Sequence, residues 1–154
     1  FGGGKVLQVL QAVKTDTFSS ASASYTDLTG ITLDITPSAT TSKILVMTQL
    51  TMSVEVGGQP ALKLLRDSTA LNMGAAAGSR TQATTTFFTE ATWEQTPVSI
   101  IYLDSPSSTS ALTYKVQGFA AGSNNIYLNQ STADTDNAGY HRTGSSITLM
   151  EIGA

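Results

Sequence analysis

The stretch Ser42–Val56, SKILVMTQLTMSVEV, decides the fold. Alternate residues in it are apolar, with Thr48 as the single interruption: Ile44, Val46, Leu50, Met52, Val54 and Val56. A period of two is that of a β-strand with one face against a core. The intervening positions begin apolar, at Leu45 and Met47, and end polar, at Ser53 and Glu55. The pattern predicts one long strand that is buried on both faces early and on one face later.

Shorter segments of the same character lie on both sides of this strand. Residues 25–36 alternate and stop at Pro37, and Gly30 shifts their parity, which is typical of a β-bulge. Residues 5–14 also fit one face of a helix, but the glycines before them and the strands downstream favour a strand. Further strands are expected at 62–67, 68–73, 97–103, 112–119, 126–128 and 147–152, with loops at 19–24, 74–78 and 131–144. Turn signals roughly every 8–12 residues predict an all-β fold, an antiparallel β-sandwich or jelly roll of about ten strands.

The composition is that of a neutral, hydroxyl-rich domain. Of the 154 residues only 12% are charged, whereas 18 are Ser and 24 are Thr. Thr next to aliphatic residues suits the pleated surface of a sheet. We expect residues 5–154 to form one domain, and residues 1–4, with their three glycines, to link it to an upstream segment. The low charge favours a virion or extracellular location.

Several classes of function are excluded or disfavoured. The chain has no cysteine, which excludes disulfides, thiolate metal sites and thiol nucleophiles. Its net charge of -3 argues against binding to nucleic-acid phosphates. No apolar run approaches the roughly 20 residues that span a bilayer, so we expect no membrane insertion.

Catalytic motifs are sparse. His141 is the single histidine, it lies in a polar segment, and no Gly-x-Ser-x-Gly elbow is present. Glu90 and Glu94 flank Trp93, and a carboxylate pair beside an aromatic side chain could serve glycoside hydrolysis. Any chain with eleven acidic residues contains some such pair. We therefore expect no enzyme, no catalytic residue and no cofactor.

The segment Asp134–Gly139 begins like a calcium loop. Its first, third and sixth positions fit that pattern, but the fifth is Ala138 and the twelfth is Ser145 in place of Glu. We expect no metal here, and an Asx-rich turn or an ion pair from Asp134 or Asp136 to Arg142 is the alternative. Structural ion pairs are likewise expected for the other two arginines. These are Arg66, which sits in an apolar strand where an unpaired charge is costly, and Arg80.

An ordered set of phrases covers nearly the whole chain. They are GGKVLQV (3–9), ITPSATTSKILVM (35–47), LRDST (65–69), AGSRT (77–81), LDSPSSTSALTYKVQ (103–117), YLNQS (127–131), DTD (134–136) and ITLMEI (147–152). Their order resembles a family of phage tail-fibre and virion-associated domains. That resemblance implies a virion or fibre location and a head module that follows a shaft. By a weaker, fold-level analogy such heads resemble the trimeric jelly rolls of the C1q and tumour-necrosis-factor type.

Two non-enzymatic functions follow from these expectations. The first is a homotrimeric fibre head that binds a host receptor or surface glycan through loop residues, and the residues expected to contact it are Trp93, Asn124, Asn125, Asn137, Tyr140 and His141. The second is an assembly or decoration module of a capsid, fibre or filament that binds only other virion proteins. Leu45, Met47 and the aromatic residues supply more apolar surface than one core requires, which leaves both a larger core and a subunit interface open.

Overall fold

A computed structural model describes residues 4–122 and 124–153, and in these residues it contains ten strands and no helix. The predicted all-β class is confirmed. The strands are β1 (Val6–Lys14), β2 (Phe18–Ser20), β3 (Thr26–Ile35), β4 (Lys43–Val54), β5 (Gln59–Arg66), β6 (Thr69–Leu71), β7 (Thr96–Asp104), β8 (Leu112–Ala121), β9 (Ile126–Leu128) and β10 (Ser145–Ile152). The glycine linker expected at 1–4 lies outside the described residues except for Gly4.

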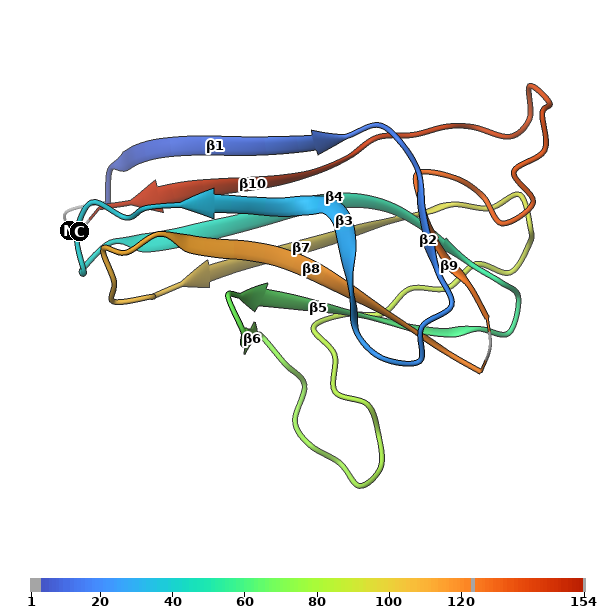
Figure 1. Cartoon of the computed structure of the whole chain (residues 1–154), viewed down its shortest axis with the longest axis horizontal. Coiled ribbons are helices and arrows are strands. Elements are labelled where there is room, and N and C mark those ends of the chain that lie inside the picture. The colour runs from blue at the N-terminus through green and yellow to red at the C-terminus, as the bar shows by residue number, and fades with distance from the viewer. Residues whose placement is uncertain (1–3, 123, 154) are drawn as a thin grey trace.

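The strands form two antiparallel sheets that face each other (Figure 1). In the first sheet β4 is central: β10 and β9 pair with one of its edges and β7 with the other. β1 then pairs with β10, and β2 with β9. The second sheet has the order β3-β8-β5-β6. Between the sheets lies a core of fully buried side chains that includes Val46, Leu50, Leu64, Tyr114 and Leu149.

The pairing pattern is that of a jelly roll. Strands pair from the two ends of the chain inward, β1 with β10, β3 with β8, β4 with β7 and β5 with β6. The chain is therefore one long hairpin, and rolling it up adds the contacts of β10 with β4 and of β8 with β5. This roll yields two four-stranded layers, β1-β10-β4-β7 and β3-β8-β5-β6, as in a double Greek key. The short strands β2 and β9 lengthen the first layer at one end.

Two local features follow directly from sequence. Gly30 has a φ of +88°, and the register between β3 and β8 shifts at this point, between Asp27 and Thr32. The bulge expected at Gly30 is therefore present, because glycine adopts this backbone conformation without the steric penalty of a Cβ atom. The segment 5–14 is a strand, since Val6–Lys14 pairs with the last strand along its length.

Other expectations need correction. The loop expected at 19–24 begins with strand β2, which pairs with β9. In β4 the order of burial is reversed: Leu45 and Met47 are half-buried, whereas Ser53 is fully buried. The loop that contains Gln130, which is distant in sequence, lies over Ser53, and the Ser53 hydroxyl donates to the Gln130 carbonyl over 2.8 Å. Alternation within the strand carries no information about that loop.

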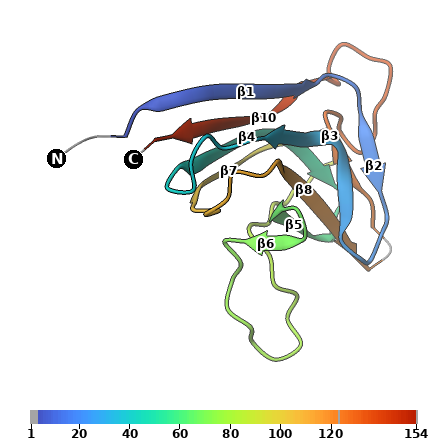
Figure 2. The ribbon, with the colours of Figure 1, turned by 60° about the vertical axis from the view of Figure 1, so that its left-hand side comes forward.

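The sandwich has two distinct ends. β1 begins and β10 finishes at the same end, where the Gly153 amide donates to the Lys5 carbonyl over 2.8 Å (Figures 1 and 2). We call this the proximal end. The opposite, distal end carries the turn 55–58, the turn between β8 and β9, the segment 129–144 between β9 and β10, and the residues 89–95 that enter β7.

Candidate binding surface at the distal end

Two segments distant in sequence form the distal surface around Trp93. The carbonyl of Thr92 accepts hydrogen bonds of 3.0 Å from the Ala133 amide and from the Thr132 hydroxyl. The Gln95 amide group donates to the His141 carbonyl over 2.7 Å and accepts from the Thr143 hydroxyl over 3.1 Å. These bonds fix the residues before β7 against the segment 129–144.

A groove of about 380 Å³ opens between these two segments. Thr51, Trp93, Glu94, Gln95, Gly139, His141 and Thr143 line it. The Trp93 side chain is 61% exposed, although an indole is among the most costly side chains to leave in water. The groove thus places an open aromatic face next to amide, hydroxyl and imidazole groups that form hydrogen bonds, which is the mixture found in small-ligand sites.

The carboxylate of Glu94 has a local role in this groove. It accepts hydrogen bonds from the backbone amides of Glu90, over 2.6 Å, and Ala91, over 3.1 Å. These bonds close the turn that presents Trp93. The Glu90–Trp93–Glu94 cluster, considered above as a carboxylate pair, is therefore a turn in which one carboxylate is occupied by the backbone.

A second, more polar concavity of about 260 Å³ lies in the segment 129–144. It is lined by Asp134, Thr135, Asp136, Asn137, Tyr140 and Arg142. Arg142 pairs with Asp134 over 2.7 Å and also donates to the Gln130 side chain over 2.9 Å. The Asn137 side-chain oxygen accepts from the Gly139 amide over 2.9 Å, which is an Asx-type turn. Both features expected of this segment, an ion pair and an Asx-rich turn, are therefore present.

The remaining two residues of the expected ligand set lie elsewhere on the distal end. Asn125 binds Glu55 through its backbone amide, over 3.0 Å, and its side-chain amide, over 2.9 Å. These hydrogen bonds to the Glu55 carboxylate lower its pKa. Asn124 reaches back to the Ala121 carbonyl over 3.4 Å. Asn124 and Asn125 therefore hold the turns of the distal end and line neither concavity.

The other ion-pair expectations have different outcomes. Arg66 donates to Asp104 over 2.6 Å, a partner 38 residues away on the opposite sheet, and the Tyr114 hydroxyl donates to the same oxygen over 2.7 Å. Arg80 forms no ion pair among the described residues, and its guanidinium reaches only the Ala77 carbonyl, over 3.3 Å. Its surroundings in the segment 74–83 contain no acidic residue. Asp136 likewise forms no ion pair within the described ranges.

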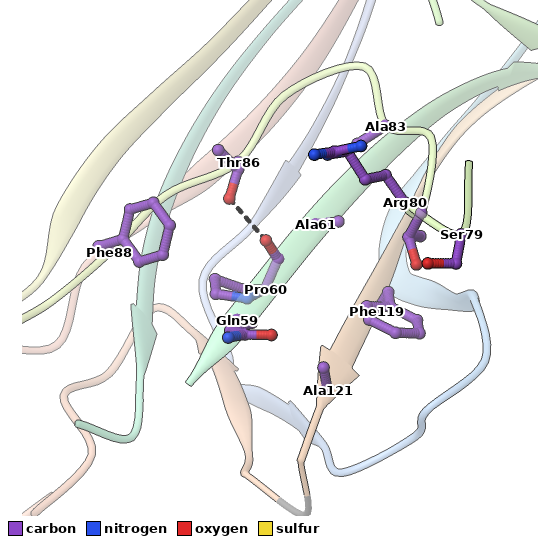
Figure 3. Close-up of a pocket in the computed structure, with 11 residues that line it drawn as sticks. Gln59, Pro60, Ala61, Ser79, Arg80, Ala83, Thr86, Phe88, Phe119 and Ala121 are labelled. Carbon is purple, nitrogen blue, oxygen red and sulfur yellow. Dashed lines mark hydrogen bonds between the residues drawn. The ribbon is translucent and has the colours of Figure 1, made fainter. Parts of the chain in front are cut away.

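A further groove, of about 510 Å³, was not predicted (Figure 3). It lies on the outer surface of β5 and β8, beneath the segment 72–95, and Phe88, Phe119, Pro60 and Arg80 are among the side chains that line it. The Thr86 hydroxyl donates to the Pro60 carbonyl over 2.6 Å, which fixes the segment over β5. No sequence pattern reveals this groove, because it depends on how an irregular segment folds back over a strand.

The described residues hold no group of three or more His, Asp or Glu side chains close enough to bind one metal ion. They also contain no helix long and apolar enough to cross a membrane.

Comparisons with known proteins show no family for this chain, so the jelly roll is identified from its strand order. No protein-family model and no curated protein sequence matches the chain. Among solved structures, it is similar to the D431N VP2 protein of infectious bursal disease virus (15% identity, TM-score 0.39, 94% of this chain, 36% of that one). It is also similar to a structure of the Gx strain of that virus (14%, 0.36, 96% and 40%) and to a VP2 subviral particle (12%, 0.34, 96% and 37%). The chain thus spans well under half the length of these proteins.

Proposed function

We propose that this chain is a non-enzymatic, virion-associated head domain of a phage tail fibre, which forms a homotrimer and binds a host receptor or surface glycan through its distal end. One observation carries the proposal. Each of the six expected ligand residues lies at the end opposite to Lys5 and Gly153, and two of them, Trp93 and His141, line one groove. A head joined to a shaft at its proximal end would present this groove outward.

The chemistry of the groove favours a carbohydrate. The apolar face of a sugar ring packs against an exposed indole, and its hydroxyl groups bond with the capacity that the groove residues retain, such as the second amide hydrogen of Gln95 and the acceptor lone pairs of the Thr143 hydroxyl oxygen. Single sites of this open kind bind weakly, but three equivalent sites on one head raise the avidity by orders of magnitude. A neutral surface rich in hydroxyl groups suits such contacts.

A glycan array probed with the fluorescently labelled domain tests the proposal. We expect binding to a subset of glycans and a loss of at least tenfold in apparent affinity for Trp93→Ala. The matched control is Phe88→Ala, which removes an aromatic side chain of similar exposure, 59%, that does not line the Trp93 groove. Binding that survives Trp93→Ala unchanged would place the glycan site elsewhere.

The alternative is an assembly or decoration module that binds only other virion proteins. The observation in its favour is the apolar outer face of the first sheet, described below, since such faces are typical of permanent protein contacts. A domain that binds no glycan on the array, yet co-assembles with other structural proteins of its virion, would support this alternative.

A further inference from the structure

The outer face of the β1-β10-β4-β7 layer carries an apolar row that crosses all four strands. Strand pairing places Leu103 opposite Leu45, Leu45 opposite Met150, and Met150 opposite Val9. Residues paired in this way point to the same side of a sheet, so the four side chains form one continuous line. Ile101 and Met47 extend the row toward the distal end.

Exposure is greatest at the two edges of this face. We define the β1 strip as Val6, Leu7, Val9 and Val13, which are 49–62% exposed, and the β7 strip as Ile101 and Leu103, which are 67% and 47% exposed. Leu45 and Met150, between the strips, are half-buried. Six of the nine large apolar side chains that are exposed in the described chain belong to these two strips. Scattered exposure is ordinary, but this degree of clustering marks an interaction surface.

Charge is nearly absent from the face. Among the outward side chains of the four strands, Lys43 is the only ionisable one, at the proximal margin. Toward the distal end polar but uncharged side chains alternate with apolar ones: Gln11 and Thr148 share a cross-strand row with Met47 and Ile101, and Gln49 and Ser99 share one with Val13. An apolar face whose polar groups are uncharged is compatible with a protein–protein interface, and one copy can approach another without repulsion between like charges.

The area of this face is sufficient for a copy that contacts two neighbours in a closed ring. Four strands about 4.8 Å apart and eight residues long, at about 3.4 Å per residue, give a flat area of about 500 Å². In a ring each copy divides this face between two neighbours, so one contact buries about 500 Å² and the two contacts of one copy together bury about 1,000 Å², the lower limit for a specific interface.

We infer that other copies of this chain cover the face, with the β1 strip of one copy packed on the β7 strip of the next. The two strips differ in sequence and lie at opposite edges, so this contact is heterologous, and a three-fold rotation between successive copies closes it into a ring of three. In such a ring all distal ends point the same way. The inference rests on the homotrimer of the proposed function and names the surface that forms it.

Cross-linking tests the arrangement, because the chain has no cysteine and introduced thiols are unique. We expect the double variant Val9→Cys/Leu103→Cys, treated with a short bismaleimide, to give covalent dimers and trimers on a denaturing gel. The single variants should stay uncross-linked alone and give only dimers when mixed. Cross-linking of Val9→Cys with itself would show a two-fold contact and overturn the inference.

A second measurement uses the native mass. Leu103→Asp and the milder Ile101→Ser should convert the trimer to a monomer, whereas Val56→Asp, at an equally exposed apolar residue of the distal turn, should leave the mass unchanged. A thermal melt checks that each variant is folded. Trimers that persist in both folded face variants would overturn the inference.

The same variants separate this inference from the proposed function. A monomeric Leu103→Asp domain that still binds glycans, with lower avidity, supports both. Intact trimers that bind no glycan contradict only the receptor function.

Discussion

The Tyr114 hydroxyl donates a hydrogen bond of 2.7 Å to Asp104, the carboxylate that Arg66 also binds. This cluster joins the two sheets at the proximal end, because Asp104 belongs to the first sheet and the other two residues belong to the second. Asp104 is 5% exposed, so its charge depends on these two donors in place of water.

Asp104→Ala should therefore destabilise the domain by about 3 kcal/mol, since it leaves the Arg66 charge and the buried Tyr114 hydroxyl without their partner. Tyr114→Phe, which removes only one donor, should cost about 1 kcal/mol. Urea unfolding of both variants measures the difference. Equal costs for the two substitutions would show that the carboxylate is not the centre of the cluster.

Acid sensitivity should come from Glu151, which is almost completely buried and has no cationic side chain bound to it in the part of the chain that the structure describes. Burial raises its pKa, but hydrogen bonds from Ser38, at 2.7 Å and 2.6 Å, and from Gln8, at 2.6 Å, outweigh burial and lower the pKa to about 2. A carboxylate with a lowered folded-state pKa stabilises the fold above its unfolded pKa, near 4.5, and loses this contribution as the pH falls toward 2.

The melting temperature should consequently fall between pH 4.5 and pH 2 in the wild type. Glu151→Gln should melt lower than the wild type at pH 7 and show a flatter pH profile over this range. Asp136→Asn is the control, because Asp136 is an exposed carboxylate with no ion pair among the described residues, and its loss should leave the profile nearly unchanged. An unaltered profile in Glu151→Gln would assign the acid sensitivity to other carboxylates.

Replacement of Asn129 by a charged side chain should destabilise the domain. Its side-chain amide donates to the carbonyls of Lys14, over 3.0 Å, and Asp16, over 2.9 Å, and its oxygen accepts from the Ser145 hydroxyl over 2.6 Å. Asn129→Asp replaces the two donations by repulsion between oxygens and should cost at least 3 kcal/mol in urea unfolding. Asn129 has a φ of +64°, so Asn129→Gly keeps the backbone relaxed and should cost less.

The hydrogen bond from Gln95 to His141 should control the order of the Trp93 groove. Gln95→Ala removes the side chain that ties both segments together and should increase amide hydrogen exchange in residues 139–143 at least fivefold, with weaker glycan binding. Gln130→Ala, which removes only the acceptor of Arg142, should have little effect on Trp93. Unchanged exchange after Gln95→Ala would show that the Thr92 contacts alone fix the groove.

Much of the fold follows from local pattern. Alternation in β4 and β10 and the bulge at Gly30 depend on residues close in sequence, and the structure confirms the strands there. The strand β2 cannot be predicted from local pattern, because Phe18–Ser20 is too short to show a period and is stabilised by pairing with β9. The ion-pair partner of Arg66 cannot be predicted from local pattern either, because only the tertiary fold brings Asp104 close to it.

The candidate site, too, is predictable from sequence only in part. Trp93 and His141 stand out in sequence as a single tryptophan and a single histidine, but only the long-range bonds of Thr92 and Gln95 place them in one groove. Asn124 and Asn125 have the composition of ligand-binding residues, yet their amides are used by Glu55 and Ala121. Residue type indicates which groups could bind a ligand, and tertiary contacts decide which remain free to do so.

The native mass of the isolated domain, measured by light scattering after size exclusion, tests the central claim most directly. A fibre head that assembles through its apolar sheet face should elute as one species of three times 16.1 kDa across the micromolar range. A single species of 16.1 kDa at the highest concentration would contradict the trimeric head.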